Sequence, residues 1–207
     1  MFNIITDSGV FTRGLADKLH YSIPIWAQLG TIFGTFSASR KTCAMAMEKA
    51  YPLIVFPGGS SEVWRPSHLP KYSLLWGERK GFARMALDHG YTIIPMSAAG
   101  MDDMWYSLFD IPAYLFFKLM GDEKRAARGD TIPFLIPSFQ FQKQYFYFGE
   151  PIKTEGLPMT EESVNEIRDK TKVAVERGID ILKGHRSKDV NRYFGLDFLF
   201  SSKKELH

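Results

Sequence analysis

The chain has 207 residues, of which 45% are hydrophobic and 24% are charged, and its formal net charge is +3. This mixture excludes a disordered polar tail and a collagen-like repeat, and the length allows a hydrophobic core without disulfide or metal staples. The weak positive charge does not reach the dense basic face of a nucleic-acid binder. We therefore expect a single domain over residues 1–207, with a C-terminal tail from about residue 185 and no nucleic-acid partner.

Cysteine content and hydropathy indicate the cellular environment of the chain. The single cysteine, Cys43, cannot close a disulfide within the chain, which favours a reducing or cytosol-facing environment. We interpret it as a small buried side chain rather than a nucleophile. Residues 1–14 show no signal-sequence pattern, and the apolar stretch 105–120 is too short and too interrupted to span a bilayer.

The predicted elements alternate between helix and strand. Good helix formers fill residues 41–50, and a short apolar strand follows over residues 53–56. Residues 78–88 predict a second helix that Gly90 caps, and residues 91–95 then predict a second buried strand. Two apolar strands joined by a helix are typical of parallel pairing, so we expect an α/β fold with a mainly parallel sheet flanked by helices.

Two further elements are predicted in the C-terminal half. Residues 139–148 indicate a third strand, and the final helix begins with Glu161 and Glu162, which complement its dipole. Its apolar face recurs at steps of three and four residues, at Val164, Ile167, Thr171, Val175, Ile179 and Leu182.

Aromatic residues make up 14% of the chain and gather in a few segments, above all residues 105–117. Such clusters either fill a core or face lipid. For residues 105–120 three interpretations stay open: packing in the core, dimerisation, or a position in a membrane interface.

A glycine-containing loop follows the first predicted strand, which is where open α/β sheets bind ligands. Paired glycines let a backbone approach a ligand, and hydroxyl and carboxylate groups add hydrogen-bonding capacity. An ordinary turn is the alternative. The loop residues are Phe56, Pro57, Gly58, Gly59, Ser60, Ser61 and Glu62.

Basic residues lie before and after this loop in the sequence. Arg40, Arg79 and Lys80 are suited to binding oxyanions through charge-assisted hydrogen bonds. A solvated helix face is the alternative interpretation of the same residues.

Four segments in chain order, residues 34–40 (GTFSASR), 56–62 (FPGGSSE), 76–84 (WGERKGFAR) and 93–96 (IIPM), resemble the glycerolipid acyltransferase family. The likeness is closest to the diacylglycerol-acyltransferase-like branch, and residues 149–152 (GEPI) resemble that family's turn before its last helix. The resemblance implies a glycerol-3-phosphate acyltransferase-like fold, acyl-CoA as co-substrate and no further cofactor or metal. It also implies that the Gly…Arg segment and the glycine loop bind the acyl acceptor.

The sequence departs from the family pattern at two places. In family members that use a phosphate-bearing acceptor, the corresponding block resembles Phe-Pro-Glu-Gly-Thr-Arg. Gly58 and Ser61 replace its Glu and Arg here, which favours a neutral acceptor. The family's His-x-x-x-x-Asp block, whose His deprotonates the acceptor hydroxyl, is matched by none of the histidines. These are His20, His68, His89, His185 and His207.

The catalytic residue is therefore unknown, and by the family's order we expect the first strand-helix part to be missing. A base recruited from His68 or His89 is an alternative, although His89 is more simply a helix cap. The resemblance implies acyl transfer to a glycerolipid hydroxyl at the cytosolic face of a membrane such as the endoplasmic reticulum, with the chain inactive as it stands. A non-catalytic lipid-binding relative, a homodimer through residues 105–120, and a phosphate-binding α/β enzyme are the alternatives.

Overall fold

The computed structural model describes residues 12–16, 21, 24–32, 34–112, 114–119, 131–138 and 141–194. The chain divides into two compact units. Unit 1 comprises Met1–Val63, Leu75–Ile93 and Ile152–Asp169, and unit 2 comprises Trp64–Leu74, Ile94–Pro151 and Lys170–His207.

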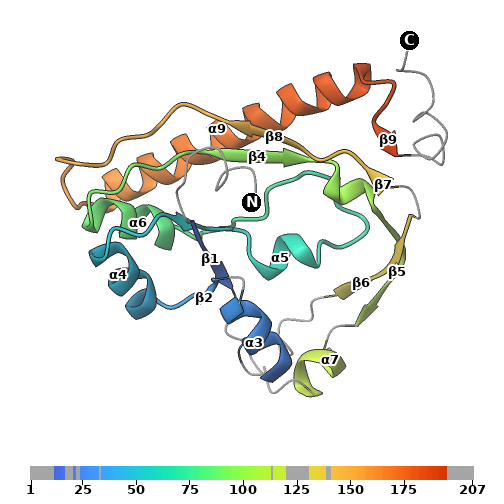
Figure 1. Ribbon diagram of the computed structural model, residues 1–207, viewed down its shortest axis with the longest axis horizontal. Coiled ribbons are helices and arrows are strands. Elements are labelled where there is room, and N and C mark those ends of the chain that lie inside the picture. Colours follow the sequence, from blue (N-terminus) through green and yellow to red (C-terminus); the bar gives the residue numbers. More distant parts are fainter. Residues whose placement is uncertain are drawn as a thin grey trace, which may run out of the picture. The chain divides into compact units, whose positions relative to one another are not determined.

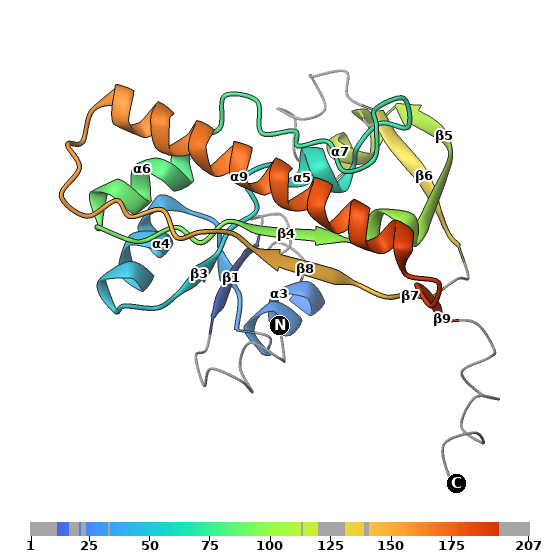
Figure 2. The ribbon, with the colours of Figure 1, turned by 90° about the horizontal axis from the view of Figure 1, so that it is seen from above.

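The centre of unit 1 is a small parallel sheet. Strands β1 (Arg13–Ala16), β2 (Phe36–Ser37) and β3 (Leu53–Ile54) are ordered β2-β1-β3, and both pairings are parallel. Figure 2 shows β1 and β3 side by side. Because all three strands point the same way, the segments that follow β2 and β3 leave the same edge of the sheet, on either side of β1.

Helices complete unit 1: α3 (Pro24–Ile32), α4 (Arg40–Glu48), α5 (Ser60–Val63), α6 (Gly81–Asp88) and the start of α9 (Glu161–Lys188). The Ser39 hydroxyl caps α4 by accepting from the Thr42 N–H at 3.1 Å. Helix α6 lies beside α4 (Figure 1). Its other face packs on α9 through a core of Ala83, Leu87, Val164 and Ile167.

The two helices predicted in this unit are confirmed as α4 and α6, with Gly90 in the left-handed conformation (φ 65°) just beyond α6. The strand predicted over residues 91–95 is not formed as expected. Within it Ile93 makes an isolated antiparallel bridge with Ile152, joined by hydrogen bonds of 2.9 and 2.8 Å in the two directions. It therefore does not run parallel to a partner.

Unit 2 is built from antiparallel pairs. Strand β4 (Met96–Ala99) pairs with β8 (Tyr145–Phe148), and β5 (Trp105–Pro112) pairs with β6 (Thr131–Pro137). The short β7 (Phe141–Gln142) pairs with β9 (Tyr193–Phe194). The prediction of an α/β fold is confirmed, but that of a mainly parallel sheet is wrong for this unit. A glycerol-3-phosphate acyltransferase-like fold stays a prediction.

Helix α9 is the longest element, and its six predicted core positions are all buried. In unit 2 it lies along β4 and β8, as Figure 2 shows. The Ser97 hydroxyl donates to the Val175 carbonyl at 2.8 Å, and a Cβ on Gly178 would lie 2.3 Å from that hydroxyl oxygen and 2.8 Å from the Tyr147 ring. The absence of a side chain at Gly178 therefore permits this close helix–sheet contact.

The aromatic segment of unit 2 forms β5 and the helix α7 (Tyr114–Leu119). Side chains on both faces of β5 are exposed, among them Tyr106 (53%) and Phe109 (52%). In α7, Phe117 is buried against Ile132 and Trp64. Packing of the whole segment in the core is therefore wrong. Within the described part of the chain, no helix combines the length and the apolar character needed to cross a bilayer.

Candidate functional site

The glycine loop leaves β3 at the carboxyl edge of the unit 1 sheet and enters α5. The Gly59 N–H donates to the Phe56 carbonyl at 3.0 Å, which closes a tight turn, and Gly59 has φ 50°. The next two amides, of Ser61 and Glu62, donate to the carbonyls of Gly58 and Gly59 at 3.2 and 3.1 Å. These three amides therefore donate within the loop itself.

Gly58 and Glu62 fix the shape of the loop. Gly58 is buried, and a Cβ built on it would lie 1.9 Å from the Glu62 carboxyl carbon. Glu62 accepts a hydrogen bond from the Leu75 N–H at 3.0 Å, which joins the loop to the chain ahead of α6. The carboxylate therefore lies directly over the Gly58 backbone, and Ser60, also half-buried, begins α5 next to it.

The Arg79 side chain contacts the glycine loop. Its guanidinium donates to the Gly58 carbonyl and, at 2.8 Å, to the Ser61 hydroxyl, with a longer bond of 3.3 Å to the Leu75 carbonyl. A planar guanidinium suits this multiple contact. Arg79 thus fastens the loop to the segment that precedes α6.

Lys80 is directed away from the loop toward the start of α9. Its ammonium contacts the Glu161 carboxylate at 2.8 Å and donates to the Asn165 side-chain oxygen at 3.0 Å. Arg84 binds the same carboxylate. The hydrogen bond from Lys80 is the largest of the effects that hold the pKa of Glu161 below its ordinary value. This pairing supports the helix junction of unit 1.

Arg40 lies at the same sheet edge as the loop. It is the first residue of α4, three residues after the end of β2, and its side chain is exposed. Because β1 separates β2 from β3, these two strands are about two strand spacings apart, roughly 10 Å. Cys43, in the same helix, is buried, and burial raises the pKa of its thiol, as expected of an inert core residue.

The outer surface of the loop is apolar. Val55, Phe56 and Val63 have exposed fractions of 40%, 62% and 65%, while Pro57 is half-buried. Nine consecutive residues therefore combine exposed hydrocarbon with hydroxyl and carboxylate groups. This arrangement suits a ligand that carries both an alkyl chain and hydroxyls.

Among the described residues of unit 1, the one histidine, His89, does not lie at this loop. His89 forms the C-cap of α6, as predicted, at the opposite end of that helix from Arg79, about 12 Å along its axis. His68 and His185 are exposed side chains of unit 2. His20 and His207 lie outside the described residues. In the described part of the chain no group of three His, Cys, Asp or Glu side chains is placed to hold a metal ion.

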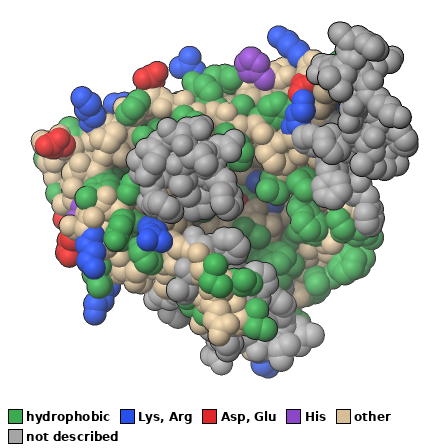
Figure 3. All heavy atoms as spheres, viewed as in Figure 1, with side chains coloured by type: hydrophobic (Ala, Val, Ile, Leu, Met, Phe, Trp, Pro, Cys, Tyr) green, Lys and Arg blue, Asp and Glu red, His purple; other side chains and the backbone are tan. Residues whose placement is uncertain are grey.

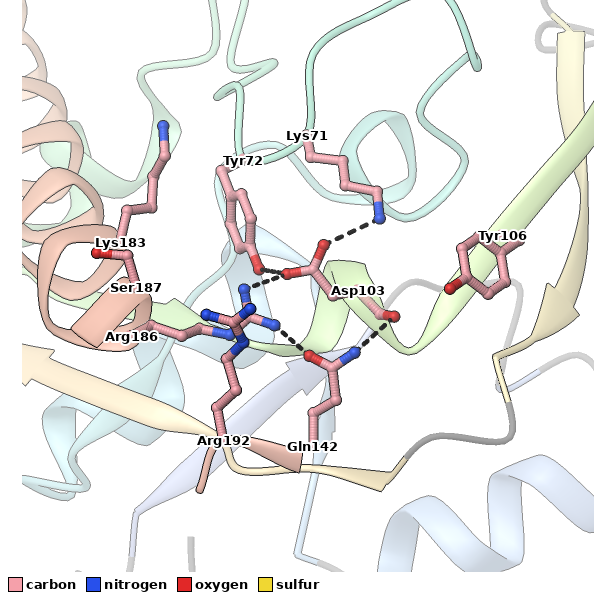
Figure 4. Close-up of a pocket in the computed structure, with 9 residues that line it drawn as sticks. All are labelled: Lys71, Tyr72, Asp103, Tyr106, Gln142, Lys183, Arg186, Ser187 and Arg192. Atoms are coloured by element: carbon pink, nitrogen blue, oxygen red, sulfur yellow. Dashed lines mark hydrogen bonds and ion pairs between the residues drawn. The ribbon is translucent and has the colours of Figure 1, made fainter. Parts of the chain in front are cut away.

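Sequence reasoning missed a second polar cluster, in unit 2, where Asp103 of the 3₁₀ helix η1 (Met101–Asp103) collects several cationic partners beside a pocket of about 390 Å³ (Figure 4). Asp103 and its neighbour Asp102 form an acidic pair in the sequence. The partners of Asp103 come from three distant segments, so no local pattern indicates them.

Comparisons with known proteins identify the family of the chain. The family model described as diacylglycerol acyltransferase matches residues 11–178. The chain therefore belongs to the diacylglycerol acyltransferase family, as its motifs predict. No solved structure matches the chain at a significant level.

Among characterised proteins, the chain is similar to phytyl ester synthase 1 of Arabidopsis thaliana, with 25% identity over 91% of the chain and 30% of that protein. It is 28% identical to the mouse DGAT1/2-independent enzyme synthesizing storage lipids, over 87% of the chain and 50% of that protein. Mouse 2-acylglycerol O-acyltransferase 1 is 25% identical over 64% of the chain and 39% of that protein. The chain spans half or less of the length of these relatives.

Proposed function

We propose that the chain serves acyl transfer from acyl-CoA to a hydroxyl of a neutral glycerolipid, with the glycine loop and the neighbouring sheet edge binding the acceptor. Family membership supports the reaction class, and relatives named as an ester synthase and an O-acyltransferase support an oxygen acceptor.

The choice of a neutral acceptor rests on the bonding partners of Arg79 and Lys80, the two cations near the loop in sequence that were candidates for binding phosphate. Arg79 is bonded to the loop itself, and Lys80 is paired with Glu161 and Asn165. Meanwhile the Glu62 carboxylate lies over Gly58. A carboxylate repels a phosphate but accepts hydrogen bonds from a hydroxyl, so the loop favours monoacylglycerol or diacylglycerol over a phosphate-bearing acceptor.

Chemistry at this site needs a base, since a hydroxyl attacks a thioester only as its proton is removed. None of the five histidines is part of a His-x-x-x-x-Asp block. We therefore propose that the chain by itself binds acceptor but turns it over at background rate.

The exposed aromatic side chains of unit 2 support the proposal that the protein binds to a membrane surface. We define the β5–β6 surface as the exposed side chains Trp105, Tyr106, Leu108, Phe109, Ile111 and Phe134. Phe109 and Phe134 stack with ring centroids 5.1 Å apart. Hydrophobic side chains gather over these strands in Figure 3. We propose that this surface lies in the interface of a membrane that holds the acceptor, with a homodimer as the alternative.

Acceptor competition tests the proposal. Binding of monoacylglycerol and of lysophosphatidic acid with the same acyl chain is first compared on this chain. Esterification of the same two lipids by acyl-CoA is then compared between this chain and a longer form of the protein that carries a His-x-x-x-x-Asp block. We expect the chain to prefer monoacylglycerol and the longer form alone to esterify it. Preference for lysophosphatidic acid would contradict the neutral acceptor, and equal inactivity of both forms would remove the enzyme function.

A further inference from the structure

Helix α3 of unit 1 has an outer face without charge. None of its nine residues is charged, whereas charged residues make up 24% of the whole chain. Ile25, Leu29 and Ile32 follow one another at steps of four and three residues, so they share an arc of about 60° on the helix. Their exposed fractions are 70%, 39% and 76%, and the exposed Gln28 lies beside them. We call these four side chains the α3 face.

The opposite side of α3 is fastened to the residue that precedes β2, which fixes how the helix is turned. The Gly30 carbonyl accepts from the Thr35 N–H at 2.8 Å and from the Thr35 hydroxyl at 3.0 Å. A Cβ on Gly30 would lie 2.9 Å from that hydroxyl oxygen and 3.4 Å from the Tyr21 hydroxyl oxygen, so the close approach depends on the missing side chain. Rotating α3 to hide the α3 face would break these contacts.

The place of α3 in unit 1 makes an uncharged outer face unusual. Helices α3 and α4 lie on opposite sides of the parallel strands (Figures 1 and 2), because right-handed connections that run in opposite directions along a sheet lie on opposite faces of it. Helix α4 also has nine residues, and its exposed side chains include the charged Arg40, Lys41 and Glu48. Helices that face water carry such residues on their outer side. The α3 face lacks them.

A second protein is a poor match for the α3 face. A helix of nine residues is about 14 Å long and about 10 Å wide. One side of it is therefore far smaller than the roughly 800 Å² that each partner of a stable protein–protein interface buries. Such interfaces also have a polar rim, and Gln28 is the one polar side chain of this face. A lipid surface needs neither, because aliphatic side chains gain free energy in hydrocarbon in proportion to the area removed from water.

We propose that the α3 face binds a membrane surface, with Ile25, Leu29 and Ile32 at the boundary between headgroups and acyl chains and the helix axis parallel to the membrane plane. Because the face has no charge, binding through it requires no anionic lipid and is not weakened by salt. This contact belongs to unit 1, which also holds the glycine loop, and is separate from the β5–β6 surface of unit 2. It does not rest on acyl transfer, since it needs no turnover.

Vesicle co-sedimentation tests whether the α3 face contributes to binding. The full chain, the double variant Ile25→Gln/Ile32→Gln and the control Met45→Gln are mixed with phosphatidylcholine vesicles at low and high salt. Met45 is an exposed residue (51%) of α4, on the other side of the sheet, and its substitution makes the same apolar-to-polar change. Glutamine is a good helix former, so both helices should persist, which circular dichroism and thermal unfolding check.

We expect the double variant to lower the vesicle partition coefficient at least tenfold and Met45→Gln to leave it unchanged. High salt should not weaken binding of the wild type. A wild-type chain that does not sediment with the vesicles, or an equal effect of the double variant and the control, would overturn the proposal.

A fluorescent label shows which residues meet the lipid and separates the α3 face from other surfaces. Ile32→Cys or Met45→Cys, each in a Cys43→Ala background, carries an environment-sensitive NBD group. When phosphatidylcholine vesicles are added, we expect the emission of the label at position 32 to shift to shorter wavelength and its quenching by iodide to fall. The label at position 45 should not change.

An unchanged label at position 32, on a chain that sediments with the vesicles, would overturn the proposal by assigning the binding to another surface. A shift at position 32 without vesicles, with a dimer in light scattering, would also overturn it, because a second copy would then cover the face. Background acyl transfer together with the vesicle-dependent shift would remove the proposed reaction and leave the membrane contact standing.

Discussion

Gly58 is the position at which one methyl group should disturb the loop most. A Cβ there would lie 1.9 Å from the Glu62 carboxyl carbon, so Glu62 must move and give up its bond from the Leu75 N–H. We predict that Gly58→Ala lowers the free energy of unfolding by roughly 1–3 kcal/mol and weakens acceptor binding. Urea denaturation measures the first effect. Gly81→Ala is the control, because its Cβ meets open space, and an equal loss in both variants would contradict the contact.

Asp103 gives the chain a predictable acid sensitivity. Its pKa is depressed in the folded state, so its contribution to stability is present above the unfolded pKa of about 4 and is lost as pH falls toward the folded value. We predict that Asp103→Asn is less stable than wild type at pH 7 and that the difference narrows below about pH 4. Urea denaturation at several pH values measures the difference in the free energy of unfolding between Asp103→Asn and wild type, with the exposed Asp180→Asn as control. A difference that stays constant with pH would contradict the prediction.

At the scale of the element, the contact of α9 with β4 and β8 depends on a helix residue without a side chain. Gly178→Ala brings a methyl group against Ser97 and the Tyr147 ring, whereas Gly184, farther along the same helix, faces open space. We predict that Gly178→Ala lowers the midpoint of thermal unfolding, whereas Gly184→Ala raises stability by about 0.5–1 kcal/mol. Stabilisation by both substitutions would show that the helix lies farther from the strands.

The β5–β6 surface is tested by removing one ring. Phe109→Ser takes an exposed aromatic out of the surface, and Phe146→Ser removes an equally exposed phenylalanine from β8. We predict that Phe109→Ser reduces co-sedimentation with neutral vesicles about tenfold and that Phe146→Ser does not. If both variants sediment like the wild type while Phe109→Ser alone shifts a dimer to monomer in light scattering, the surface joins two copies instead.

For the whole molecule, the elements predicted from sequence are those with a strong local signal. Helices α4, α6 and α9 follow from helix formers and from apolar residues at steps of three and four. Strands β1 and β2 are too short for a periodic pattern, and apolar runs do not reveal strand direction, so the antiparallel pairing of β4 with β8 was not foreseen. Strand β5 is exposed on both faces and lacks the alternation typical of a half-buried strand.

In the candidate site, too, features that depend on neighbouring residues could be predicted, and contacts between distant residues could not. The glycine loop and its place after β3 follow from neighbouring residues, and so does the His89 cap. The bonds from Arg79 to Gly58 and from Lys80 to Glu161 join residues far apart in the chain. The sequence indicates Arg79 and Lys80 as possible phosphate ligands, whereas the tertiary contacts pair both with internal partners. These contacts agree with the neutral acceptor that the sequence already favours.

Photolabelling of the chain in detergent micelles tests the acceptor site most directly, because it needs no turnover. A monoacylglycerol carrying a diazirine near its glycerol is crosslinked and the labelled residues are mapped by mass spectrometry. We predict labels within residues 55–63 and near Arg40, competed by unlabelled monoacylglycerol more strongly than by lysophosphatidic acid. Labels confined to other segments, or equal competition by the two lipids, would contradict a neutral acceptor site at this sheet edge.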